Sequence, residues 1–202
     1  KVFIHEAMHF MRLDFSCINN DNIDDLIYSF LPLKKNDIRV YESYCEFWAI
    51  VLNSCFSSFF HTKIKNNYEN MFNKFMKIIQ NEISFSIFQM NKILNHYNLK
   101  YTDLINNESN SKCKNYKEDT YVISYFILKT ILLYSINDFF HWIQKYNGSI
   151  KFKHSNIFQF INFFKNHYLS NNFIQDIQKI QTIQSNNKFI NNTLRMSVYE
   201  EN

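Results

Sequence analysis

Glycine and proline are almost absent from this chain of 202 residues, which contains one of each, Gly148 and Pro32. These two residue types mark most tight turns, and a fold built from many short strands needs many such turns. Their scarcity argues against a turn-rich β fold and favours long helices. We therefore predict a mainly α-helical fold with little or no sheet.

A strong charge of one sign is also lacking. The chain has 22 Lys and Arg against 18 Asp and Glu, and its formal net charge is +4. The lysines are scattered, and no basic run is interleaved with aromatic residues as in nucleic-acid binding segments. We expect no nucleic-acid partner.

Cysteines are few, and their spacing is uninformative for metal binding. The four are Cys17, Cys45, Cys55 and Cys113, and no two of them form a C-x-x-C pair. Cys45 and Cys55 fall on one predicted helix, too far apart to form a disulfide. We expect free thiols and an intracellular, reducing compartment.

Long apolar runs are missing as well. The most apolar stretches cover residues 47–60 and 122–136, and Lys129 interrupts the second. Both are shorter than the roughly 18 to 20 residues that cross a bilayer. We predict two buried core helices and no membrane span.

Apolar residues recur at helical spacing along most of the chain. The pattern predicts helices over residues 2–13, 23–31, 37–61, 63–80, 83–97, 118–146, 154–169 and 171–184. The polar stretch 98–117 is predicted to be a mobile loop with a turn at 102–105, and residues 193–199 to be strand or extended. We expect one domain over 1–202 that lacks its N-terminal part, because Lys1 lies four residues before the first candidate ligand.

A His-Glu-x-x-His motif opens the chain at His5, Glu6 and His9. On a helix, residues i and i+4 lie on one face, one turn apart, so His5 and His9 can bind the same metal ion. Glu6 follows the first histidine and can reach a water molecule at that ion. Two imidazoles and a neighbouring carboxylate are the groups that a zinc hydrolase needs.

Two glutamates occur one turn apart on the strongly apolar helix predicted over 37–61. Glu42 and Glu46 share a helix face with Ala49, a small residue that lets another helix approach closely. Buried carboxylates are costly unless they are paired or bound to a metal. The alternative is that this face is a solvated edge.

Together, His5, Glu6, His9, Glu42 and Glu46 resemble the gluzincin pattern of zinc metallopeptidases. The resemblance implies a zincin-like helical domain in which the HExxH helix faces the Glu-bearing helix. It implies Zn²⁺ held by His5, His9 and Glu42, with Glu6 as general base and Glu46 hydrogen-bonded to a ligand histidine, His5. The reversed assignment, with Glu46 as ligand and Glu42 behind it, stays open.

The residues in and around both motifs resemble those of uncharacterised metallopeptidases of large DNA viruses. Asn, Ile, Lys, Phe and Tyr are abundant here, and all five are encoded by A/T-rich codons, which fits such a source. Virus-infected host cytoplasm or the virion would then be the compartment. The resemblance covers about the first fifty residues only. The Leu194-Arg195-Met196-Ser197 stretch near the end also fits it.

The group that would stabilise the oxyanion is not marked by any motif. That role needs a His, Tyr or Arg close to the metal. The candidates are Tyr41, Tyr121, Tyr125 and Arg195.

The resulting hypothesis is a metallopeptidase that hydrolyses peptide bonds in a peptide or protein substrate. A water molecule activated by zinc would attack the carbonyl, and Glu6 would move its proton to the leaving amine. Two other classes remain: a zinc-dependent binding or structural protein without turnover, and a metal-free helical interaction protein.

Overall fold

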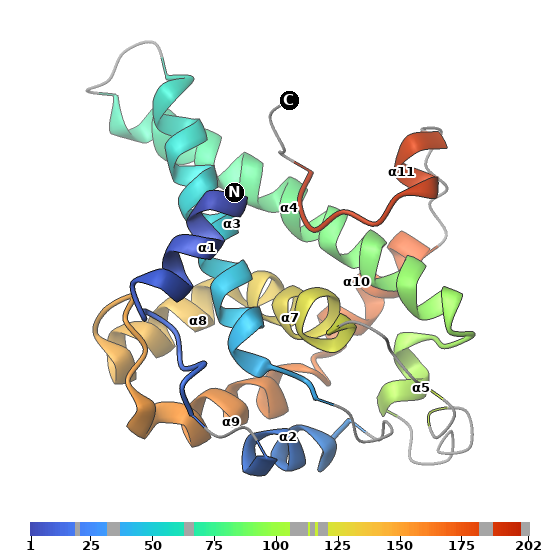
Figure 1. Cartoon of the computed structure of the whole chain (residues 1–202). Coiled ribbons are helices and arrows are strands. Elements are labelled where there is room, and N and C mark those ends of the chain that lie inside the picture. Colours follow the sequence, from blue (N-terminus) through green and yellow to red (C-terminus); the bar gives the residue numbers. More distant parts are fainter. Residues whose placement is uncertain are drawn as a thin grey trace.

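The computed structural model describes residues 1–18, 21–31, 37–62, 67–105, 113, 116, 121–181 and 188–198, and every regular element within them is a helix (Figure 1). The predicted mainly α-helical fold is confirmed for these residues. The elements in chain order are α1 (Val2–Phe10), α2 (Asp21–Tyr28), α3 (Val40–Phe60), α4 (Tyr68–His96), α5 (Tyr101–Ile105), η2 (Ile123–Leu128), α7 (Lys129–Tyr134), α8 (Ile136–Trp142), η3 (Ile143–Asn147), η4 (His154–Asn156), α9 (Ile157–His167), α10 (Asn171–Gln181) and α11 (Lys188–Asn192).

Helix α3 is the central element, and α1, α4, η2 and α7 all pack against it (Figure 1). Its apolar residues occur nearly all round the helix, and Tyr44, Phe47 and Ala49 are fully buried. The helix begins after Arg39, which adopts a left-handed conformation with φ 50°. The expected buried helix is therefore present, and both of its glutamates are buried within it.

Helix α4 is longer than the sequence pattern predicts. Two helices were expected over 63–80 and 83–97, whereas one helix runs from Tyr68 to His96. Nothing breaks it, because the intervening residues Asn81 and Glu82 are both compatible with a helix. Its N-terminus is capped by the Asn67 side chain, which accepts a hydrogen bond of 2.9 Å from the Asn70 amide. Residues 63–66 lie outside the described part.

The prediction of a single long helix over 118–146 is wrong. Instead, residues Ile123–Tyr134 and Ile136–Asn147 form two arms at 86° to each other. The break is at Ser135, whose φ of −98° and ψ of 33° are not helical. The bend turns Phe139 toward the ring of Phe160, at a centroid distance of 5.8 Å. Gly148 ends the second arm at φ 71°, the left-handed conformation common for a glycine at the end of a helix.

None of the described helices is by itself long and apolar enough to cross a bilayer. The two arms meet that requirement of length and composition only when they are taken together, across the 86° bend.

The C-terminal segment, residues 193–198, forms neither helix nor strand. It lies against α4 and α7 because buried or half-buried side chains bind it. Lys92 Nζ donates to the Thr193 carbonyl at 2.6 Å, and Lys129 Nζ donates to the Met196 carbonyl at 3.0 Å. The Ser197 hydroxyl donates to Glu82 Oε1 at 2.6 Å. A strand is thus not formed here, and residue 199 lies outside the described part.

The remaining predictions are met in part. The four cysteines are free thiols, as expected. The turn predicted at 102–105 is helix α5, whereas most of the loop expected over 98–117 lies outside the described residues. The helix expected over 154–169 is η4 followed by α9, and the one over 171–184 is α10. The helix expected over 23–31 is α2, which begins at Asp21 and ends at Tyr28.

Candidate metal centre

The two histidines of the HExxH motif lie on the side of α1 that faces α3. His5 is 7% exposed, and Met8 beside it is 1% exposed, so this side of the helix is anchored in the core. The Nε2 atoms of His5 and His9 lie 3.1 Å apart. The i, i+4 spacing therefore does bring both imidazoles to one point.

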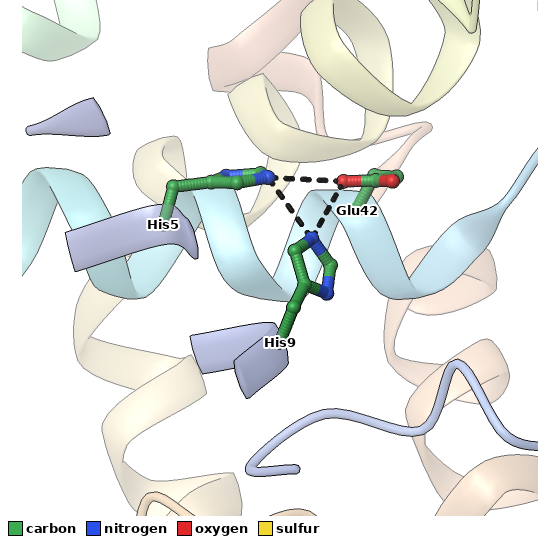
Figure 2. A group of neighbouring side chains, drawn as sticks. All are labelled: His5, His9 and Glu42. Carbon is green, nitrogen blue, oxygen red and sulfur yellow. Dashed lines mark hydrogen bonds and ion pairs between the residues drawn. The ribbon is translucent and has the colours of Figure 1, made fainter. Parts of the chain in front are cut away.

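Glu42 reaches the same point from α3. Its Oε2 atom lies 3.2 Å from His5 Nε2 and 3.3 Å from His9 Nε2 (Figure 2). This oxygen is buried and makes no hydrogen bond of good geometry. Three ligand-type atoms thus converge on one another. The two imidazole nitrogens form a hydrogen bond of 3.1 Å, and the carboxylate oxygen is left without one.

These distances fit a common metal ion. Ligand atoms about 2.0 to 2.1 Å from a tetrahedral zinc ion are separated from each other by about 3.3 to 3.4 Å. The three measured separations are 3.1, 3.2 and 3.3 Å. Two imidazole nitrogens and one carboxylate oxygen also form the donor set of a zinc site that keeps one position open.

Glu46 lies behind His5. Its Oε1 atom is 2.8 Å from His5 Nδ1, the ring nitrogen that points away from Glu42. Its other oxygen pairs with Lys1 Nζ at 2.7 Å, and the Glu46 side chain is only 2% exposed. The contacts therefore separate the two carboxylates: Glu42 lies beside the two Nε2 atoms, and Glu46 contacts the opposite side of the His5 ring.

A third carboxylate, which the sequence pattern did not single out, contacts the other histidine. Asp14 Oδ2 lies 2.5 Å from His9 Nδ1, and Asp14 is 4% exposed. Its Oδ1 atom accepts hydrogen bonds from the amide and the hydroxyl of Ser16. The helix predicted over 2–13 ends just before Asp14, and no role was predicted for this residue. The sole signal was an acidic residue five positions after His9.

Cys45 completes a second group of ligand-type atoms with His9 and Asp14. Its Sγ atom lies 3.8 Å from His9 Nδ1 and 3.6 Å from Asp14 Oδ2. The 2.5 Å contact between His9 and Asp14 is a direct hydrogen bond, too short for two ligands of one ion. We interpret this group as a buried hydrogen-bond cluster behind His9.

The charges in the metal-free protein stabilise one another. Burial alone would lower the pKa of His5, but the adjacent carboxylates of Glu42 and Glu46 raise it to about 9. Burial would raise the pKa of Glu42, and the adjacent histidines lower it instead. The pKa of Glu46 is lowered to about 2, against the effect of burial, by His5, Lys1 and Lys129. A proton on His5 thus takes the place that a cation could fill.

Two of the four oxyanion candidates lie beside the two histidines. The Tyr125 ring, on η2, is centred 6.4 Å from the His5 ring, and its hydroxyl interacts with Glu42. The Tyr41 ring is 5.9 Å from the His9 ring. Tyr121 instead lies under the guanidinium of Arg39, and Arg195 belongs to the C-terminal segment.

Glu6 lies on α1 next to His5 and is exposed, whereas its neighbour is buried. A carboxylate at that position is open to solvent and to any molecule that approaches α1.

A scan against protein-family models found no match, and searches of curated proteins and of solved structures found no similar chain either.

Proposed function

We propose that this chain is a zinc-dependent metallopeptidase with a zincin-like core, in which His5, His9 and Glu42 hold the metal and Glu6 is the general base. One observation carries the proposal. The two Nε2 atoms and the buried Glu42 Oε2 atom converge within 3.1 to 3.3 Å of one another, and that oxygen has no hydrogen bond of good geometry.

Zn²⁺ bound by these three groups would supply Lewis-acid chemistry, polarising a carbonyl and lowering the pKa of a water molecule toward about 7. The protein residues would do the rest. Glu6 would take the proton of the attacking water and pass it to the leaving amine. Glu46 and Lys1 would hold His5 in one orientation through the contact at Nδ1.

Tyr125 is the best supported candidate for the group that stabilises the oxyanion. Burial, the charge of Glu42 and a hydrogen bond to it raise the pKa of the Tyr125 phenol, so the hydroxyl keeps its proton and can donate it in a hydrogen bond. A phenol beside the ligands can move from Glu42 to the carbonyl oxygen of a bound peptide as negative charge develops there.

The sharpest test of the proposed function is Glu6→Gln, which removes the base and keeps the shape of the side chain. We expect zinc content to remain near one equivalent while hydrolysis of a peptide library is lost. Glu69→Gln is the matched control, because Glu69 is also exposed on a helix, away from α1.

Undiminished hydrolysis by Glu6→Gln would exclude Glu6 as the base. One equivalent of zinc with no hydrolysis of any peptide by the parent chain would point instead to a zinc-binding protein without turnover. A parent chain that binds no zinc would point to a helical interaction protein.

A further inference from the structure

We propose that Asp14 is a positioning residue for the metal centre, fixing the ring of His9 as Glu46 fixes the ring of His5. The inference rests on the proposed metal site and adds a residue outside the HExxH and Glu-x-x-x-Glu pattern. The motif would then extend from His5-Glu6-x-x-His9 to an aspartate five residues later.

The backbone after α1 is shaped to deliver Asp14 to His9. Arg12 adopts a left-handed conformation with φ 52°, which costs free energy for a residue other than glycine. The Leu13 amide then bonds back to the Met8 carbonyl at 2.9 Å, so the chain reverses directly beneath the last turn of α1. This reversal places the Asp14 side chain against the His9 ring.

Contacts with Phe152 and Phe160 hold this turn in place. The Leu13 carbonyl accepts a hydrogen bond of 2.7 Å from the Phe152 amide. Phe15 is fully buried, and its ring is centred 4.4 Å from that of Phe152 and 5.7 Å from that of Phe160. Asp14 therefore lies between a helix and a residue anchored in the aromatic core, and it has little freedom to move away from His9.

The chemistry of the contact is directional. A carboxylate that accepts a hydrogen bond from Nδ1 keeps the proton on that nitrogen and leaves the lone pair on Nε2. Nε2 is the His9 atom that lies 3.3 Å from Glu42 Oε2 and 3.1 Å from His5 Nε2. Asp14 is thus placed to set both the tautomer and the orientation that a metal ligand needs.

Other polar contacts hold the carboxylate itself. Ser16 donates to Asp14 Oδ1 from its hydroxyl at 3.1 Å, and the Cys45 thiol lies 3.6 Å from Oδ2. Oδ2 contacts the imidazole at the shorter distance, with the thiol as its second partner. A carboxylate that only closed the turn would not need its second oxygen 2.5 Å from a ring nitrogen.

The test compares Asp14→Asn and Asp14→Ala with the parent chain in zinc affinity and in the visible spectrum of the Co²⁺-substituted protein. Asparagine can still accept the Nδ1 hydrogen bond but carries no charge, whereas alanine removes both. We expect zinc binding about 10-fold weaker with asparagine and about 100-fold weaker with alanine. The Co²⁺ bands should shift most with alanine, because the His9 ring is then free to rotate.

Asp138→Asn is the matched control. Asp138 also contacts a histidine, at 3.3 Å from His167 Nε2, but its side chain is 67% exposed and belongs to α8. The Asp138→Asn substitution should leave zinc affinity and the Co²⁺ spectrum unchanged.

The ring nitrogens of His9 can also be followed by ¹⁵N NMR in the metal-free protein. The spectra should show a proton on Nδ1 in the parent and in Asp14→Asn.

The possible outcomes separate this inference from the proposed function. If the parent chain binds no zinc, the metal site itself is wrong. If the parent binds zinc and both Asp14 variants bind it equally well with an unchanged Co²⁺ spectrum, only the role of Asp14 is refuted. Thermal unfolding of the variants distinguishes a folded chain with weaker zinc binding, which supports the proposal, from a general loss of structure. If Asp14→Ala does not fold, the Asp14→Asn comparison alone decides.

Discussion

Each imidazole of the site offers two nitrogens, and different carboxylates contact them. Glu42 approaches the Nε2 atoms of both rings, whereas Glu46 and Asp14 contact the Nδ1 atoms of His5 and His9. In the proposed site, this division separates the candidate ligand Glu42 from the two carboxylates that would orient the histidines. It also bears on the choice between Glu42 and Glu46, which sequence spacing left open.

Replacing each glutamate by glutamine tests that choice. We expect Glu42→Gln to weaken zinc binding more than 100-fold at pH 7, because a charged ligand oxygen is lost. Glu46→Gln should weaken it by about 10- to 100-fold, the usual effect of losing an outer hydrogen-bond partner. Competition with a chelator of known affinity measures both. A larger loss for Glu46→Gln would support the reversed assignment.

At the scale of helices, local periodicity predicted well the elements that carry the site. Helix α1 follows from the apolar residues around His5 and His9, and α3 from the apolar run that contains Glu42. What periodicity could not predict is the turn that ends α1. A left-handed Arg12 has no sequence signature, so the predicted helix ran on to residue 13 and Asp14 was not placed at the site.

Helix breaks were predicted less well, for a physical reason. With one Gly and one Pro in the chain, breaks are set by packing rather than by residues that stop helices. Ser135 is compatible with a helix, yet the chain bends there because the aromatic side chains of α8 pack into the core. Conversely, α4 continues through Glu82 because buried contacts with the C-terminal segment satisfy that carboxylate.

Lys129, at the contact between α7 and the C-terminal segment, should make the stability of the fold depend on pH. Lys129 is 1% exposed, and burial lowers its pKa to about 8, against attraction from Glu46 and Glu82. An unfolded lysine has a pKa near 10.4, so between these values the unfolded chain binds more protons than the folded one. This group therefore stabilises the fold increasingly as pH rises through that window.

Comparison of the parent chain with Lys129→Met isolates this effect, since other titrating groups are common to both. The free energy of unfolding of the parent should gain up to about 1.4 kcal/mol per pH unit relative to the variant between pH 8 and 10. Denaturant titration at several pH values measures the difference. Lys77→Met, at an exposed position of α4, should show no such trend. A pH-independent difference for Lys129→Met would contradict a buried, deprotonating lysine.

At the scale of the whole molecule, the candidate site joins segments that are distant in sequence. Spacing could place His5 with His9, and Glu42 with Glu46, because each pair lies within one helix. That the two pairs would face each other was predicted only by resemblance, and the packing of α1 on α3 brings them together. The contact of Asp14 with the site depends on an aromatic core that includes Phe152 and Phe160, far along the chain.

The central claim is that three side chains from α1 and α3 form one zinc site. X-ray absorption at the zinc edge of the zinc-loaded chain tests it most directly. We predict one zinc per chain, with only nitrogen and oxygen neighbours at about 2.0 to 2.1 Å and the outer-shell scattering of two imidazoles. A sulfur neighbour at about 2.3 Å would show that Cys45 is a ligand and would contradict the site described here, as would a chain that binds no zinc.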